Sequence, residues 1–275
     1  MFSSNAFAAV SGSLPAGFMQ WYVGLMIVAV IVGTVADMIH KGSAKYFFAN
    51  ARKTRAQGKP VNKASIAVKT VAVDVLASGE FCNPRRRVAH LLTMYGFILY
   101  VVTTALMVFV YPTAATPTPA LVSQLWWLGG LMVMVGGYWF WFFIRVDVAA
   151  EGSSPLRLMR ADLFILSLLA SVTAGLLWAW LQASGSAVSW LFFGLYLLAT
   201  TVLFGGVYWS KFAHMFFKPA AAFDKRLAEA DGTNMNLPLL SRDDPAQRER
   251  HSMELLRDAP MDMGLGIKRE APRHY

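Results

Sequence analysis

The stretch RRRVAHLLTMYGF, residues 85–97, joins a strongly basic segment to an apolar run that continues to residue 111. Three consecutive arginines are typical of the cytoplasmic surface of a membrane. His90 follows them inside the apolar run, where an ionisable ring is costly and needs a reason. The stretch therefore predicts a transmembrane helix that starts at a basic membrane surface and carries a histidine close to that surface.

Composition and hydropathy extend this pattern to the whole chain. The 275 residues are 56% hydrophobic and 15% charged, whereas a soluble domain carries about 25% charged residues. Each of five apolar runs reaches the roughly 20 residues that a helix needs to cross about 30 Å of hydrocarbon, and none alternates with the period of a strand. We expect an all-α polytopic membrane protein with five transmembrane helices, at residues 18–39, 88–111, 121–144, 159–181 and 187–209.

The basic residues predict the orientation of these helices. Of the 25 lysines and arginines, 11 lie in residues 41–87, 3 in residues 145–160 and 11 from residue 211 onward. The positive-inside rule then places the N-terminus outside and the C-terminus in the cytoplasm. We expect a multi-pass protein of the cell's inner, cytoplasmic membrane. Its predicted parts are an external segment (1–16), a five-helix membrane domain (17–217) with a basic cytoplasmic loop (41–87), and a cytoplasmic tail (218–275).

The loop and the tail are predicted to meet other molecules. The loop sets 11 basic residues against Asp74 and Glu80, a net charge of +9, which suits anionic lipid or an acidic soluble partner. Within it, residues 64–77 are predicted to form an interfacial amphipathic helix. The tail is expected either to be extended or to become ordered on a partner protein, and short helices are expected at 222–230 and 244–256. No motif for nucleic acid is present, and the single cysteine, Cys82, excludes an intrachain disulfide.

Two histidines at the predicted cytoplasmic surface suggest a metal site. His90 begins the second apolar run, and His214 follows the fifth, whose helix we expect to continue past His214 and to stop at Pro219. Because these two helices run in opposite directions, both imidazoles are expected at the same depth, as the two axial ligands of one haem b. The cations Arg86, Arg87 and Lys211 stand within one helical turn of a histidine, where they would hold the haem propionates.

Alternatives to this site stay open. Each histidine is also explained as an interfacial side chain that pairs with polar neighbours. His40, at the end of the first apolar run, is an alternative haem ligand. A haem-free structural anchor or a small transporter is the rival function, although the inverted repeats and interrupted helices of transporters are not visible. The glycine pairs 129–130 and 136–137 predict close helix packing rather than ligand contact.

The arrangement resembles the cytochrome b subunit of respiratory nitrate reductase. The residues Asp74-Val75-Leu76, Arg86-Arg87-Val88-Ala89-His90-Leu91-Leu92 and Tyr95-Gly96-Phe97 are more similar to a branch of that superfamily, the membrane subunits of quinone-interacting oxidoreductases in sulfur metabolism. The chain length and the long tail resemble the membrane anchor of adenylylsulfate reductase. The resemblance implies a haem b subunit that passes electrons between a cytoplasmic redox enzyme and membrane quinone.

One departure from that family limits the prediction to a single haem. The nitrate reductase subunit has a second, outer haem, but here Tyr100 and Tyr196 stand in the outer halves of the second and fifth runs, which contain no histidine. We therefore expect quinone near the inner haem, with His40, Lys211 or Asp37 at its headgroup. The chain is predicted to be an electron-transfer or quinone-reactive subunit, with no complete reaction of its own.

Overall fold

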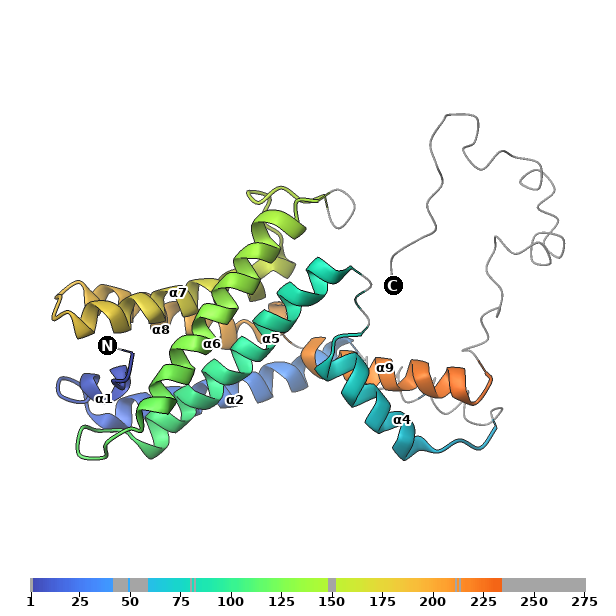
Figure 1. Cartoon of the computed structure of the whole chain (residues 1–275), viewed down its shortest axis with the longest axis horizontal. Helices are drawn as coiled ribbons and strands as arrows, with labels where there is room; N and C mark the ends of the chain where they lie inside the picture. Colours follow the sequence, from blue (N-terminus) through green and yellow to red (C-terminus); the bar gives the residue numbers. More distant parts are fainter. Residues whose placement is uncertain are drawn as a thin grey trace. The chain divides into compact units, whose positions relative to one another are not determined.

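The computed structural model describes residues 2–41, 49, 59–79, 81, 83–147, 152–210, 212 and 214–233. The chain divides into two compact units, one formed by residues 1–44 and 84–217 and the other by residues 45–83 and 218–275. All regular structure in the described residues is helical, which confirms the all-α prediction (Figure 1). The predicted helix at 244–256 lies outside the described residues.

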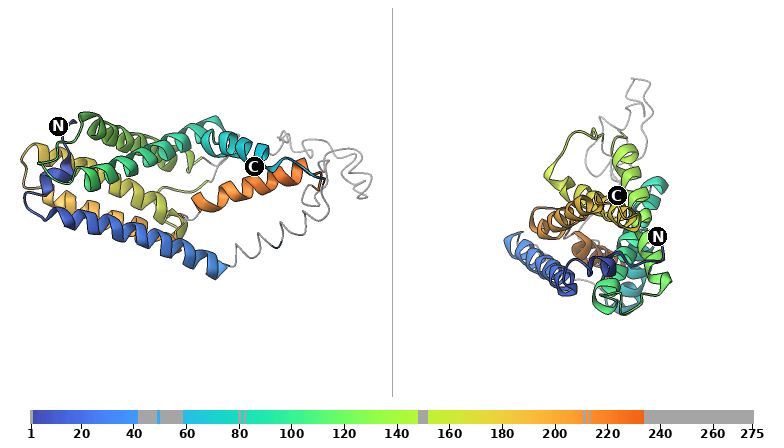
Figure 2. Two further views of the ribbon diagram at one scale, coloured as in Figure 1. Left: turned by 90° about the horizontal axis from the view of Figure 1, so that it is seen from below. Right: turned by 90° about the vertical axis from the view of Figure 1, so that its left-hand side faces the viewer.

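Unit 1 is built from long apolar helices that run alongside one another (Figure 2). A short helix, α1 (Ala6–Val10), precedes α2 (Ala16–Lys41). The helix α5 (Pro84–Ala105) ends in a π-helical turn, η2 (Leu106–Val110), and α6 (Ala120–Trp139) ends in another, η3 (Phe140–Ile144). A 3-10 turn, η4 (Arg160–Asp162), leads into α7 (Leu163–Ala183), and α8 (Ser189–Gly205) follows.

Four of these helices are long and apolar enough to cross a membrane, at Gly17–His40, Pro84–Val110, Ala120–Ile144 and Arg160–Ala183. They correspond to the first four predicted spans. The fifth predicted span contains α8, whose 17 residues rise only about 25 Å along the helix axis. The structure therefore supports a multi-pass membrane protein, while the fifth crossing and the orientation stay predictions.

Glycine pairs on α6 hold the centre of unit 1 together. A Cβ atom on Gly136 would lie 2.6 Å from the carbonyl oxygen of Ala89 on α5, whereas one on Gly137 would lie 2.6 Å from Cδ2 of Leu169 on α7. Gly129 and Gly130, seven residues earlier, face the same two helices in the same order. The first glycine of each pair thus admits α5 and the second admits α7, so the predicted close packing is confirmed.

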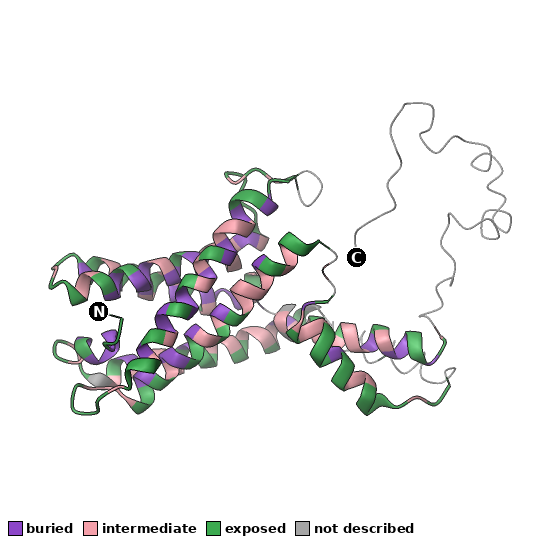
Figure 3. Cartoon of the chain, in the orientation of Figure 1, coloured by how far each residue is buried: buried purple, intermediate pink, exposed green. Residues whose placement is uncertain are grey.

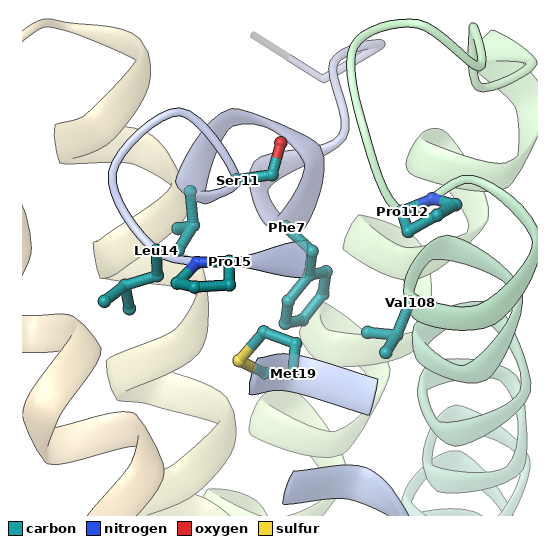
Figure 4. Close-up of a pocket in the computed structure, with 8 residues that line it drawn as sticks. Phe7, Ser11, Leu14, Pro15, Met19, Val108 and Pro112 are labelled. Atoms are coloured by element: carbon teal, nitrogen blue, oxygen red, sulfur yellow. The ribbon is translucent and has the colours of Figure 1, made fainter. Parts of the chain in front are cut away.

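One end of unit 1 is closed by the N-terminal segment. The Asn5 side chain donates to the carbonyl oxygens of Met107 and Tyr111, at 3.4 and 2.9 Å, and accepts from the backbone N–H groups of Phe7 and Ala8. Phe7 enters the core beside Trp178, with ring centroids 5.1 Å apart. A small pocket remains beside α1, and Phe7, Ser11, Met19 and Val108 are among the residues that line it (Figure 4). The segment predicted only as external is therefore part of the packed bundle.

The opposite end carries Arg86, Arg87 and Arg145, and we call it the arginine end. Arg145 is fully buried and pairs with Asp162 at 2.6 Å, so the end of η3 is joined to the start of α7. The guanidinium also donates to the carbonyl oxygens of Ser154 and Arg157 and stacks over Trp141 at 4.2 Å. A buried charge needs such partners, because an uncompensated one is strongly destabilising.

Unit 2 joins the loop between α2 and α5 to the C-terminal segment. The helix α4 (Lys63–Lys69) continues as the π-helix η1 (Thr70–Leu76), which confirms a helix in the region predicted to be amphipathic. Most of α9 (His214–Ala230) belongs to the same unit. Arg226 of α9 donates twice to the Asp74 carboxylate, with the Nη2–Oδ1 bond at 2.8 Å. The backbone N–H of Lys59 also donates to the carbonyl oxygen of Asp231 at 3.0 Å.

Candidate functional site at the arginine end

His90 lies in the second turn of α5 and is half-buried. Phe97 and Thr104 stand seven and fourteen residues later, on the same face of the helix because seven residues make nearly two turns. Phe97 packs against the core, and Thr104 is buried and accepts a 2.9 Å hydrogen bond from Nε1 of Trp126. That face of α5 is therefore directed to the interior of unit 1.

The two arginines that precede His90 are placed as expected. Arg86 and Arg87 lie in the first turn of α5 and are half-buried, while Arg85 is exposed. Residues four and three positions before a helical histidine share its side of the helix. Two cations therefore stand one turn from the His90 imidazole, at the end of the apolar core.

The helix that leads to His214 is not continuous, so the prediction of an unbroken fifth helix was wrong. The helix α8 ends at Gly205, and a 3-10 turn, η5 (Val207–Trp209), and the extended residue Ser210 follow it. The break follows two adjacent glycines, Gly205 and Gly206, and glycine is a poor helix former. Beyond them, the Ser210 hydroxyl accepts a 3.1 Å hydrogen bond from the backbone N–H of Phe212. A serine that bonds to nearby backbone in this way favours a turn over a helix.

The break changes where the chain goes after α8. The Phe212 ring is buried at 3% exposure and meets Phe164 and Phe204 edge-on, with centroids 5.4 and 5.9 Å apart. Met215, three residues on, also packs against the core. In a continuous helix His214 would stand about 13 Å beyond Gly205. The backbone of His214, the first residue of α9, is instead held at the arginine end between two core residues.

The break also overturns the predicted helix stop. Pro219 lies inside α9, which continues to Ala230 and is followed by Gly232 with a positive φ of 80°. Pro219 is the sixth residue of α9 and has no N–H group, so the helix lacks the hydrogen bond that this position would donate to the carbonyl oxygen of Met215. The side chain of His214 and all of Lys211 lie outside the described residues.

Tyr100 of α5 and Tyr196 of α8 give a common reference point for comparing depths along these two helices. A Cβ atom on Gly175 of α7 would lie 2.5 Å from the Tyr100 hydroxyl and 3.0 Å from Cδ2 of Tyr196, so side chains from α5 and α8 converge there. His90 stands ten residues from Tyr100, and Gly206 stands ten residues from Tyr196. Each interval is about 15 Å of helix rise. Because both intervals lead from the two tyrosines toward the arginine end, His90 and the end of α8 lie at about the same depth in the bundle.

His40 takes a different position from His90. It is exposed near the end of α2, and its ring meets Tyr208 of η5 edge-on with centroids 5.7 Å apart. One turn earlier Asp37 is buried at 2% exposure. A Cβ atom on Gly33 would lie 2.9 Å from Cβ of Val207, which places this part of α2 directly against η5. His40 therefore belongs to the surface of the arginine end and not to its core.

A haem at this end stays a prediction, because the side chain of His214 lies outside the described residues. The described residues contain no group of three or more side chains suited to holding a bare metal ion. A haem needs only two protein ligands, and imidazole is a usual one. Helices in direct contact lie about 8–10 Å apart, which is too close for an iron between two imidazoles. In the described residues α5 packs chiefly on α6, and α8 packs on α7 and α2, so the helix that carries His90 is not pressed against α8.

No protein-family model, no curated protein and no solved structure matches this chain. The resemblance to cytochrome b subunits therefore stays a prediction from the sequence. Phe212 is the residue of the site that sequence reasoning missed. The signal was present in Gly205-Gly206 and Ser210, which interrupt the helical pattern just before it.

Proposed function

We propose that this chain is the membrane anchor and electron-transfer subunit of an oxidoreductase complex, with one haem b held by His90 and His214. The observation that carries the proposal is the turn after α8. It buries Phe212 beside Phe164 and so holds the backbone of His214 at the end of the core where His90 points inward. Two histidines on separate segments at one end of an apolar core favour haem over unrelated surface roles.

Each residue has a distinct role in this proposal. The His90 and His214 imidazoles would hold the haem iron, and Arg86, Arg87 and Lys211 would offset the charge of the two propionates. A haem b supplies one-electron transfer when it is bound. The protein contributes an apolar interior formed by Phe97, Phe164 and Phe212, which would exclude water from the haem.

The arginine end is proposed to face the cytoplasm, following the positive-inside rule. A cytoplasmic redox enzyme would dock on the basic loop and the tail, and the resemblance in sequence names adenylylsulfate reductase as the candidate. Membrane quinone is the second electron partner. His40 and Asp37 are proposed to meet its headgroup, because they lie at the same end of unit 1, on the last turns of α2.

The proposal is tested by the visible spectrum of the purified full-length protein. A reduced-minus-oxidised difference spectrum is expected to contain a b-type band, and His90→Ala and His214→Ala are each expected to abolish it. His40→Ala is the matched control, because it removes a histidine at the same end without removing a proposed axial ligand. A normal band in His90→Ala or His214→Ala refutes that ligand pair.

A second variant separates ligand loss from misfolding. His90→Met keeps an iron ligand at the same position, and methionine with histidine raises the haem potential. We expect His90→Met to retain a band with a higher midpoint potential. A wild-type protein that is folded and monodisperse but has no band supports the haem-free structural anchor instead.

A further inference from the structure

The helix formed by α4 and η1 exposes apolar side chains to its surroundings. Val68 is 70% exposed and Val71 is 51% exposed, and Ala72 beside them is also exposed. These three residues, which we call the valine face, lie three and four positions apart and so share one side of the helix. Figure 3 shows that most of the length of this helix is exposed.

The opposite side of the same helix is polar and is used against α9. Asp74 binds Arg226 through two hydrogen bonds, and Thr70, one turn earlier, is only 2% exposed. The exposed side of α9 is charged at Lys225 and Glu229. A surface helix in water buries its apolar side and exposes its polar side. Because Val68, Val71 and Ala72 are exposed while Thr70 and Asp74 are covered, the valine face is built to be covered by something apolar.

The sequence around the valine face indicates what kind of surface covers it. Only residues 77–83 separate η1 from Pro84, where the spanning helix α5 begins, and seven residues reach at most about 25 Å when fully extended. The valine face therefore stays close to the membrane surface. Lys63 and Lys69 are exposed on the same helix. A helix that exposes an apolar face together with lysines has the pattern of a helix that lies in the interface of an anionic membrane.

We propose that the valine face inserts into the surface of an anionic lipid bilayer, with Lys63 and Lys69 at the phosphate headgroups. The Asp74–Arg226 pair fixes which side of the helix is turned to the lipid, because it commits the polar side to α9. This inference rests on the membrane spans alone and is independent of the haem. Its failure would leave the difference spectrum unchanged.

The test uses full-length protein in vesicles and one fluorescent label. Cys82, the only cysteine, is first changed to serine. Val71→Cys then places a polarity-sensitive fluorophore on the valine face, and Lys225→Cys places it on the exposed side of α9 as the matched control. In vesicles of phosphatidylcholine with phosphatidylglycerol, the label at 71 is expected to be quenched by spin-labelled acyl chains and protected from iodide, whereas the label at 225 shows the reverse.

Charge and alternative covers are tested in the same system. Lys63→Gln with Lys69→Gln is expected to lower the ratio of inserted to free valine face in anionic vesicles by about fivefold for each lysine removed. Equal iodide quenching at 71 and 225 in every vesicle would overturn the proposal. So would protection of position 71 from both quenchers, because a protein segment such as residues 234–275 would then be the cover in place of lipid.

Discussion

The ring of Phe212 lies edge-on against the ring of Phe164, with centroids 5.4 Å apart, although the helix α8 has already ended at Gly205. This contact returns the chain to the core that it would otherwise leave. It joins the segment after α8 to the start of α7, and it sets the position from which α9 and His214 begin. The proposed haem site therefore depends on a residue that does not ligate the iron.

The first prediction follows from that contact. Phe212→Ala removes a buried ring, which costs about 3–5 kcal/mol in a well-packed core. We expect the b-type band to be lost or strongly reduced, with the α-helical circular dichroism of the detergent-solubilised protein largely retained. Phe143→Ala, at a ring that is 71% exposed, is the control and should leave the band unchanged. A full band in Phe212→Ala would show that His214 is not positioned by this ring.

The second prediction concerns the ion pair in unit 2. The hydrogen bonds from Arg226 lower the pKa of Asp74 below its ordinary value, and Lys225 and Lys69 add to the effect. A carboxyl with a lowered folded-state pKa stabilises the fold above its unfolded pKa, and this contribution is lost as the pH falls through the folded value. The contact of α4 and η1 with α9 should therefore weaken only below about pH 4.

Hydrogen exchange of the amides in residues 63–76 measures that contact. Protection in the wild type is expected to fall below about pH 4, whereas Asp74→Asn should show the lower protection already at neutral pH. The exchanged pair, Asp74→Arg with Arg226→Asp, is expected to restore part of the wild-type protection at neutral pH. Equal protection of wild type and Asp74→Asn at pH 7 would contradict a role for the pair in holding unit 2 together.

The third prediction tests the glycine packing of α6. A methyl group on Gly136 would meet the carbonyl oxygen of Ala89 at 2.6 Å, and backbone yields less easily than a flexible side chain. Overpacking of this kind costs about 1–3 kcal/mol, so Gly136→Ala should lower the thermal unfolding midpoint by several degrees. Gly194→Ala is the control, because nothing lies within 4 Å of its would-be Cβ atom. An equal midpoint for the two variants would argue against tight contact between α5 and α6.

The sequence predicted the features that depend on composition and spacing. Four apolar runs became helices of spanning length, and the glycine pairs at 129–130 and 136–137 mark the faces of α6 that admit its neighbours. These two predictions are confirmed because the length of an apolar run and the size of a residue determine structure within a single helix. The same reasoning placed His90 inside the start of α5, next to Arg86 and Arg87.

The features that sequence reasoning missed arise from contacts between distant segments. Asn5 bonds to the carbonyl oxygens of Met107 and Tyr111, and Arg226 pairs with Asp74, across separations of more than 100 residues. The break after α8 was missed because a continuous apolar run predicts one helix, even where Gly205 and Gly206 lower its helix propensity. Its outcome depends on the pocket that Phe164 and Phe204 offer to Phe212, which no local pattern encodes.

The most direct test of the central proposal is the haem content of the purified wild-type protein, measured together with its redox titration. We predict one b-type haem per chain, low-spin in both oxidation states and titrating as a single one-electron couple, as two imidazole ligands require. A folded protein that lacks haem, or that holds two, would contradict a single site formed by His90 and His214.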